Sequence, residues 1–66
     1  MTLGNKIMTL RAAARISQEE LAEKLGVTQR KISYWEGGDV DPDMYSLWKI
    51  SDFFEVSVDY LIGKID

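Results

Sequence analysis

The sequence predicts an all-α domain of five short helices, and three of its features carry that prediction. Apolar residues recur every three or four positions along most of the chain, which is the spacing of one helix face. A serine, threonine or aspartate stands before the second, third and fourth of the five segments, as N-cap residues do. Glycines and the single proline separate the segments. With 66 residues the chain is expected to form one domain over residues 1–66.

The first two helices are expected over residues 3–14 and 18–25. The apolar stripe of the first is formed by Leu3, Ile7 and Leu10. Ser17 precedes the second helix and Glu20 follows three residues later, which is the pattern of a capping box. Gly26 is expected to end this helix, because glycine adopts the left-handed conformation without steric cost.

The other three helices are expected over residues 29–36, 42–54 and 57–63, the last beginning at residue 57 or 58. Thr28 is the expected N-cap of the third helix, and the glycine pair 37–38 ends it. Asp41 is expected to cap the fourth, with Pro42 at its first position, where no N–H is needed. The inward-facing residues of these helices are Ile32, Trp35, Leu47, Ile50, Ser51, Phe54, Val58, Leu61 and Ile62.

Composition excludes several classes of chemistry. The chain has no cysteine and no histidine, so disulfides, ordinary zinc sites and a histidine general base are excluded. Carboxylates leave only a weak magnesium or calcium site open. No apolar run is long enough to span a membrane, and no secretory signal is visible, so we expect a cytoplasmic protein. No nucleophile paired with a base is visible either, and we expect neither an enzyme nor a cofactor.

Charge is distributed unevenly along the chain, whose net charge is −3. Residues 1–35 contain six lysines and arginines and three glutamates, whereas residues 36–66 contain two lysines and eight acidic residues. Such a division can present a basic face from an acidic body, so the negative net charge does not exclude a nucleic-acid partner.

The second and third expected helices form a recognisable unit. The turn between them is too short for an antiparallel hairpin, so the helices must cross steeply. Ala22 offers a small contact at such a crossing and Gly26 offers the turn. An apolar seam of Leu21, Val27 and Ile32 completes the pattern of a helix-turn-helix unit.

Residues 16–36 resemble the core of the phage repressor and Cro family of helix-turn-helix proteins, also called the xenobiotic-response-element family. The resemblance continues through Gly38, Pro42 and the segments 47–50 and 56–62. It implies a five-helix, lambda-repressor-like DNA-binding domain with the helix-turn-helix at its second and third helices. It also implies that the third helix enters the DNA major groove, and that a homodimer binds a palindromic operator.

The third helix carries the polar side chains that groove recognition requires. Its outward residues, with the N-cap before them, are Thr28, Gln29, Arg30, Lys31, Ser33 and Tyr34. Glutamine can pair bidentately with adenine and arginine with guanine. The resemblance assigns base reading to Gln29, Arg30 and Tyr34, and a phosphate contact to Gln18. The alternative interpretation is a solvated helix face, and Lys6 and Arg15 are open to phosphate contact or simple solvation.

Two further expectations concern structure near this helix. The resemblance implies a structural ion pair between Arg11 of the first helix and Glu36 at the end of the third. After the third helix the sequence departs from the family, because Asp39 stands where many members carry a basic residue facing phosphate. We therefore expect few side-chain contacts to phosphate from this loop, although the N–H groups of Gly37 and Gly38 remain available.

The C-terminal half contains more large side chains than one small core needs. We expect Met44 and Trp48 to lie partly in the core. Tyr45, Phe53 and Tyr60 are the candidate dimer surface, and the alternative is that they are scattered exposed aromatics.

The leading functional hypothesis is sequence-specific binding of double-stranded DNA by a transcription regulator, most simply a repressor. The alternative is an antitoxin-like or regulatory interaction module, whose acidic half binds another protein and for which DNA binding is secondary. A toxin that co-purifies with the protein would favour the alternative.

Overall fold

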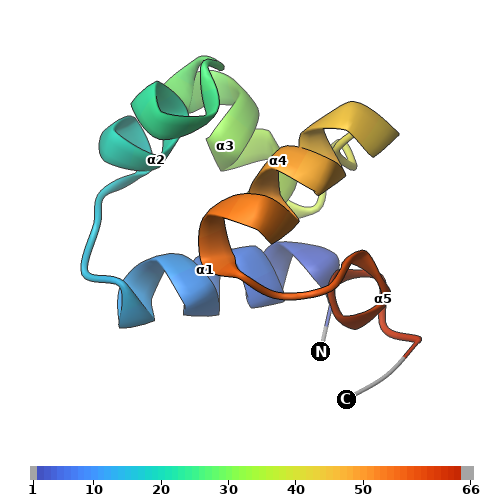
Figure 1. Ribbon diagram of the computed structural model, residues 1–66. Coiled ribbons are helices and arrows are strands. Elements are labelled where there is room, and N and C mark those ends of the chain that lie inside the picture. The colour runs from blue at the N-terminus through green and yellow to red at the C-terminus, as the bar shows by residue number, and fades with distance from the viewer. Residues whose placement is uncertain (1, 65–66) are drawn as a thin grey trace.

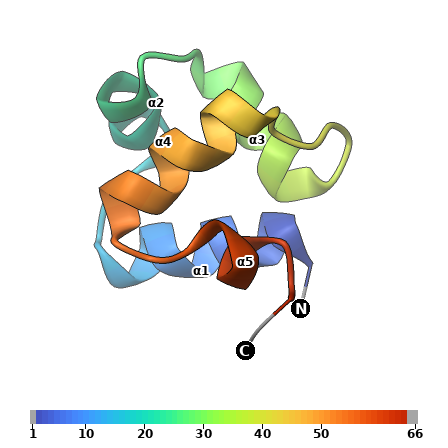
Figure 2. The same cartoon turned by 45° about the vertical axis from the view of Figure 1, so that its right-hand side comes forward.

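The computed structural model describes residues 2–64, and within that range it contains five α-helices and no strand. They are α1 (Leu3–Ala13), α2 (Gln18–Leu25), α3 (Gln29–Gly37), α4 (Met44–Phe54) and α5 (Val58–Leu61). Figure 1 shows α1 below the α2–α3 pair, with α4 running diagonally across and α5 beside the N-terminal half of α1. The turned view in Figure 2 brings α4 and α5 to the front. The predicted all-α class with five helices is confirmed.

Side-chain caps set where most of these helices begin. The predicted capping box is present: Ser17 Oγ accepts from the Glu20 N–H at 3.0 Å, and Glu20 Oε1 accepts from the Ser17 N–H at 3.0 Å. Thr28 Oγ1 accepts from the Lys31 N–H at 3.2 Å in the same way. Gly26 ends α2 with a φ of 71°, the left-handed conformation expected there. Local sequence therefore determines the ends of α2 and α3 to within one residue.

The predicted start of α4 is wrong. Asp43 is its N-cap, not Asp41, because Asp43 Oδ1 accepts from the Ser46 N–H at 2.8 Å. Hydrogen bonds from Ser46 hold the pKa of the Asp43 carboxyl below its ordinary value, and the positive charge of Lys31 lowers it further. Pro42 lies before the cap, so it is not the first residue of the helix as predicted. Pro42 is buried, and its ring packs inside the domain. The same aspartate–proline–aspartate sequence thus permits two caps, and packing of the proline selects the second.

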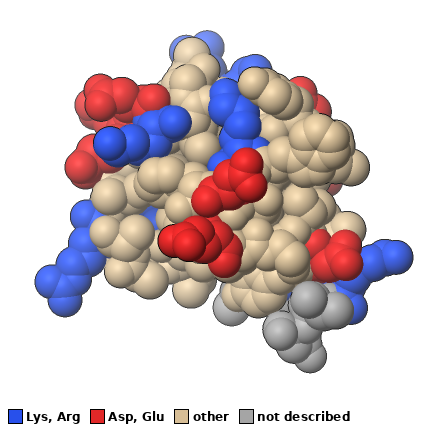
Figure 3. Space-filling model, viewed as in Figure 1, with Lys and Arg blue, Asp and Glu red and all other residues tan. Residues whose placement is uncertain are grey.

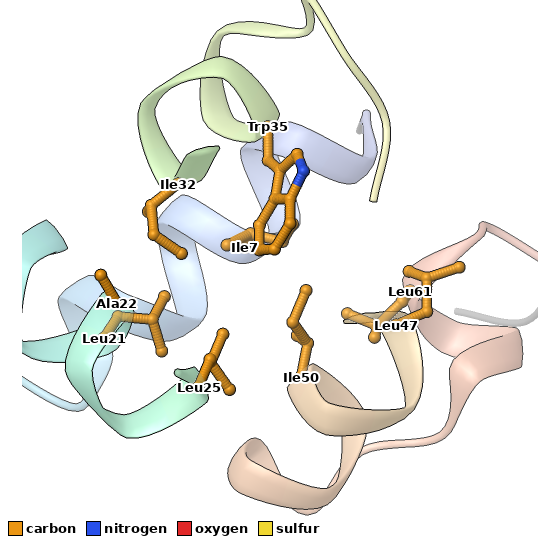
Figure 4. Packing of buried hydrophobic residues seen from close by; sticks show 9 residues of the cluster. All are labelled: Ile7, Leu21, Ala22, Leu25, Ile32, Trp35, Leu47, Ile50 and Leu61. Carbon is orange, nitrogen blue, oxygen red and sulfur yellow. The ribbon is translucent and has the colours of Figure 1, made fainter. Parts of the chain in front are cut away.

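The core gathers apolar side chains from all five helices, as Figure 4 shows. Its buried members are Ile7, Leu21, Ala22, Leu25, Ile32, Trp35, Leu47, Ile50 and Leu61. Each helix contributes to one cluster, so the faces predicted to be inward meet except at the end of α5. Ile62 was expected to face inward but is 47% exposed, because α5 ends at Leu61. This single core holds α3 at a defined position relative to α1 and α2.

Helices α1 and α3 approach each other closely at Gly4. A Cβ built on Gly4 would collide with the carbonyl oxygen of Trp35 and would lie 2.6 Å from that of Glu36. Only a residue without a side chain fits between the two backbones. The first turn of α1 therefore packs directly on the end of α3.

Three other expectations about single residues fail. Met44 and Trp48 are not in the core, because each is 58% exposed on the outer side of α4. Lys6 is neither solvated nor free to contact a phosphate. It is 8% exposed, and its Nζ donates to the Tyr60 carbonyl oxygen at 2.7 Å. The ammonium also lies 4.8 Å from the centre of the Tyr60 ring, so Lys6 fastens α5 to α1.

Candidate nucleic-acid interface

The connection between α2 and α3 is the tight turn that the sequence predicts. After Gly26, the Val27 N–H returns to the Ala22 carbonyl oxygen at 3.0 Å, which satisfies the end of α2 within the turn. Leu21, Ala22 and Ile32 are buried beneath it. Helix α3 is therefore packed against α2 along its inner side.

The opposite side of α3 is polar and exposed. Ile32, Trp35 and Glu36 point inward. The exposed residues are Thr28, Gln29, Arg30, Lys31, Ser33 and Tyr34. Every α3 residue predicted to face DNA thus lies on the solvent-accessible part of the helix, which is the arrangement that a groove-reading helix needs.

A buried carboxylate lies directly behind this face. Glu36 is 7% exposed and accepts three hydrogen bonds through its two oxygens. Two come from Arg11, whose Nε lies 2.7 Å from Oε2 and whose Nη2 lies 3.1 Å from Oε1. Arg11 Nη1 donates to the Ile16 carbonyl oxygen at 2.9 Å, and the bond to Glu36 raises the pKa of the guanidinium. The hydrogen bonds of the Arg11 guanidinium therefore join α1 to α3 and to the segment that precedes α2.

The third hydrogen bond to Glu36 leads outward to the exposed face. Gln18 Nε2 donates to Glu36 Oε1 at 2.9 Å, and Gln18 Oε1 accepts from Gln29 Nε2 at 3.3 Å. The charge on Glu36 thereby sets the orientation of the Gln18 amide, and Gln18 in turn sets that of Gln29. Gln29 is left with its amide oxygen and one N–H for an external partner, which are one acceptor and one donor.

The sequence did not reveal that Gln18 and Gln29 touch. They are separated by eleven positions and belong to different helices. Two long amides near the N-termini of consecutive short helices are the available signal, but only the crossing of α2 and α3 converts it into a contact. Gln18 therefore has a structural partner in addition to the phosphate contact predicted for it.

A largely apolar cavity of about 420 Å³ opens beside α3, between that helix and the beginning of α4. It is lined by Thr28, Arg30, Lys31, Tyr34, Trp35, Val40, Asp43 and Ser46. The sequence did not predict this hollow, because it is created by two segments whose relative position depends on the loop between them. Arg30, Lys31 and Tyr34 thus border both the exposed face of α3 and this cavity.

The loop after α3 is acidic at its surface, and its backbone is already engaged. Asp39 and Asp41 are exposed. The Gly38 N–H donates to the Trp35 carbonyl oxygen at 3.2 Å, and the Asp39 N–H donates to that of Tyr34 at 3.0 Å. The expectation that the Gly38 N–H is free for phosphate is therefore wrong, because it closes the end of α3.

The three residues predicted to form a dimer surface have different surroundings. Tyr45 is 67% exposed on α4. Phe53 is 38% exposed and packs edge-on against Phe54, with ring centres 4.9 Å apart. Tyr60 is half-buried beside Lys6. Tyr45 shares the outer side of α4 with Met44 and Trp48, whereas Phe53 and Tyr60 belong to the α4–α5 end of the domain.

Two searches of residues 2–64 complete the description of the site. No helix there is both long and apolar enough to cross a membrane. Within the same range, no group of three or more acidic side chains is placed to hold a metal ion.

Comparison with known proteins agrees with this geometry. The HTH-type transcriptional regulator ImmR of Bacillus subtilis (strain 168) is 41% identical over 64 residues, 97% of this chain and 50% of that protein. The HTH-type transcriptional activator BcrR of Enterococcus faecalis is 44% identical over 63 residues, 96% of this chain and 31% of that protein. The chain thus spans half or less of the length of these two relatives.

A solved structure matches along almost the whole chain. The P22 c2 repressor, in complex with a synthetic operator, superposes with a TM-score of 0.92 at 29% identity, covering 98% of each chain. The family description of helix-turn-helix proteins matches residues 7–61, which include α2, α3 and the core that supports them. With this match, and with α2 and α3 joined by the tight turn described above, the chain belongs to the helix-turn-helix family.

Proposed function

We propose that this protein binds double-stranded DNA at specific sequences as a transcription regulator, most simply a repressor, with α3 in the major groove. The observation that carries the proposal is the exposed polar face of α3 backed by the Glu36–Gln18–Gln29 chain of hydrogen bonds. A site held in one geometry before binding loses less entropy when it binds. The likeness to a repressor in complex with its operator supports the same function. Because its target is chromosomal or phage DNA, we also propose a cytoplasmic location.

In this proposal each side chain of α3 has a defined role. Gln29 offers one donor and one acceptor, which match N7 and the N6 amino group of adenine. Arg30 is placed to read guanine in the same bidentate manner. Tyr34 contacts the edges of neighbouring bases. Lys31, Ser33 and Thr28 contact the sugar–phosphate backbone of the DNA next to those bases. Gln18, at the first position of α2, contacts a phosphate.

Removing either main reader is expected to relax sequence preference. Gln29→Ala and Arg30→Ala should each weaken binding to a selected duplex by about 1–3 kcal/mol, the usual value of one bidentate base contact. Selection from random duplexes, followed by titration of the selected sequence and single-base variants, measures this effect. Lys64→Ala is the matched control, because it removes a positive charge from an exposed position after α5. Parent-like affinity and preference in both α3 variants would reject the assignment.

Affinity should depend only weakly on salt. The exposed Asp39 and Asp41 beside α3, together with the net charge of −3, limit the number of phosphates that the domain neutralises. A plot of log affinity against log salt should therefore correspond to about three to five ions per monomer. Asp39→Lys should tighten binding and steepen the slope by about one. Asp59→Lys, an equal charge change on α5, should do neither, and a steep slope for the parent protein would contradict the prediction.

We further propose that the functional unit is a homodimer on a palindromic operator. A single α3 presents few base-reading side chains, and two copies related by a two-fold axis double the readout. Such a pair would place its α3 helices about 34 Å apart, one turn of DNA. Phe53 and Tyr60, at the α4–α5 end, are the members of the predicted surface that we assign to this contact.

Sedimentation with and without a selected duplex tests the dimer. We expect a weak dimer or a monomer in free solution and two protomers on a palindromic duplex. Phe53→Ser should lower the cooperativity of binding to the full site without changing affinity for an isolated half-site. A one-to-one complex on a non-palindromic site, with no dimer at any protein concentration, would contradict the proposal.

A further inference from the structure

The outer side of α4 exposes an apolar surface that the proposed DNA contact does not use. Met44 and Trp48 are each 58% exposed and Tyr45 is 67% exposed. Figure 3 shows the largely uncharged area over the first half of α4. We call these three side chains of α4 the α4 outer face; large exposed apolar groups gathered in this way mark interaction sites.

The α4 outer face is directed away from the reading helix. Ser46 is the α4 residue that lines the cavity beside α3. Met44 and Trp48 lie two positions before and after it, which places each about 160° around the helix from Ser46. Leu47 and Ile50 occupy the inward side. A partner bound to the α4 outer face would therefore leave Gln29 and Arg30 free to contact DNA.

The charges around this face indicate which kind of partner fits. Asp41 stands three positions before Met44, and Asp52 lies one helical turn beyond Trp48; both are exposed. Lys49 is the neighbouring cation, and its Nζ lies 5.1 Å from the centre of the Tyr45 ring. Two carboxylates against one ammonium leave the border negative. A second copy of the chain would bring like charges together, whereas a basic partner would meet opposite ones.

We propose that the α4 outer face binds an amphipathic helix of another protein, one whose apolar stripe is flanked by lysine and arginine. Met, Tyr and Trp are the residue types enriched in protein interfaces. Met44 and Trp48, at i and i+4, form a ridge against which a second helix can pack. The partner's apolar stripe covers this ridge and the Tyr45 ring, and its basic flanks meet Asp41 and Asp52. This interaction goes beyond DNA binding, since it gives the domain a second surface that can be occupied on DNA.

Trp48 supplies the measurement, because Trp35 is only 4% exposed and will not sense a bound peptide. The probe is a synthetic helical peptide of about 16 residues with leucines on one face and lysines on both flanks. Binding should shift the Trp48 emission to shorter wavelength in a saturable way. A twin peptide with glutamate in place of every lysine should bind at least about tenfold more weakly. A second twin with serine in place of every leucine should give no shift.

Variants of the protein decide whether this face is the site. Tyr45→Ala should weaken the lysine peptide about tenfold while leaving Trp48 as reporter. Asp41→Lys combined with Asp52→Lys should reverse the preference, so that the glutamate peptide binds better. The control combines Glu23→Lys with Asp59→Lys, which changes the charge equally elsewhere and should keep the parent's preference. Circular dichroism and titration with a selected duplex should be unchanged by Tyr45→Ala.

Three results would overturn the proposal. The first is equal binding of the lysine and glutamate peptides, and the second is unchanged binding after Tyr45→Ala. The third is concentration-dependent self-association, without peptide, that Trp48→Ala abolishes, because it would show that a second copy covers this face. All three leave the effect of Arg30→Ala on DNA binding as a separate test, so this inference and the proposed function fail independently.

Discussion

Gly4→Ala is expected to destabilise the domain by about 3 kcal/mol, at the upper end of the cost of overpacking. The added methyl group would meet the carbonyl oxygens of Trp35 and Glu36, which are backbone atoms and cannot turn aside. Helices α1 and α3 would have to separate, and the contact of Ile7 with the core would loosen. A domain of this size is stabilised by only about 3–5 kcal/mol, so the variant should keep no more than about 2 kcal/mol and up to about half of it should be unfolded at room temperature.

Urea unfolding followed by circular dichroism measures this effect, and Gly37→Ala is its matched control. Gly37 has no positive φ, and a Cβ there would meet only the Asp39 side chain, at 3.4 Å. Its replacement should leave the domain as stable as the parent or slightly more stable, because alanine favours helix by about 1 kcal/mol over glycine. Helix propensity alone predicts the same gain for Gly4→Ala. An unchanged or raised urea midpoint for that variant would show that α1 does not pack on α3 as described.

Glu36→Ala is expected to have the second large effect, a loss of about 3 kcal/mol of stability. It removes the acceptor of three hydrogen bonds and leaves the Arg11 side chain, 19% exposed, with only the Ile16 carbonyl oxygen. Breaking one side of a buried pair costs about 3–5 kcal/mol, and the partial exposure of Arg11 places this case at the lower end. Glu23→Ala, an exposed glutamate of α2, should change stability little.

A double-mutant cycle distinguishes the ion pair from general packing. Arg11→Ala, Glu36→Ala and the double variant should show a coupling energy of about 1–3 kcal/mol. The part of the Glu36→Ala protein that remains folded should also discriminate less at the base assigned to Gln29, because Gln18 no longer has a fixed partner. Additive effects on stability, together with parent-like base preference, would show that the hydrogen-bonded chain from Glu36 to Gln29 has no role.

Local patterns were enough to predict most helix ends. Ser17 with Glu20, Thr28 before α3 and Gly26 after α2 all act where the sequence indicates, because caps bond groups only two or three positions away. The start of α4 was misplaced because Asp41 and Asp43 are equally good caps by sequence. The burial of Pro42 decides between them, and burial depends on the whole domain.

The candidate site likewise has a part that the sequence predicts and a part that depends on the whole fold. The exposed polar residues of α3 could be predicted from the sequence, because helical periodicity places them outward once Ile32 and Trp35 are taken as inward. The link from Glu36 through Gln18 to Gln29 could not, because its members come from two helices whose crossing is set by the core. Lys6 could not be placed from the sequence either. The sequence leaves it open to solvent or phosphate, but in the structure its ammonium donates to a carbonyl oxygen of α5.

The all-α class, the five helices and the polar face of α3 can be predicted from the sequence, because they depend on spacing and on caps within a few residues. The packing of the whole domain determines which side chains those helices bring together. It closed α1 on α3 at Gly4, placed a carboxylate behind the glutamines, and left Met44 and Trp48 outside the core. Periodicity shows that a helix has an apolar side, but several orientations of α4 satisfy it. The fit of Leu47 and Ile50 into a core already filled by four other helices selects one orientation and thereby exposes the α4 outer face.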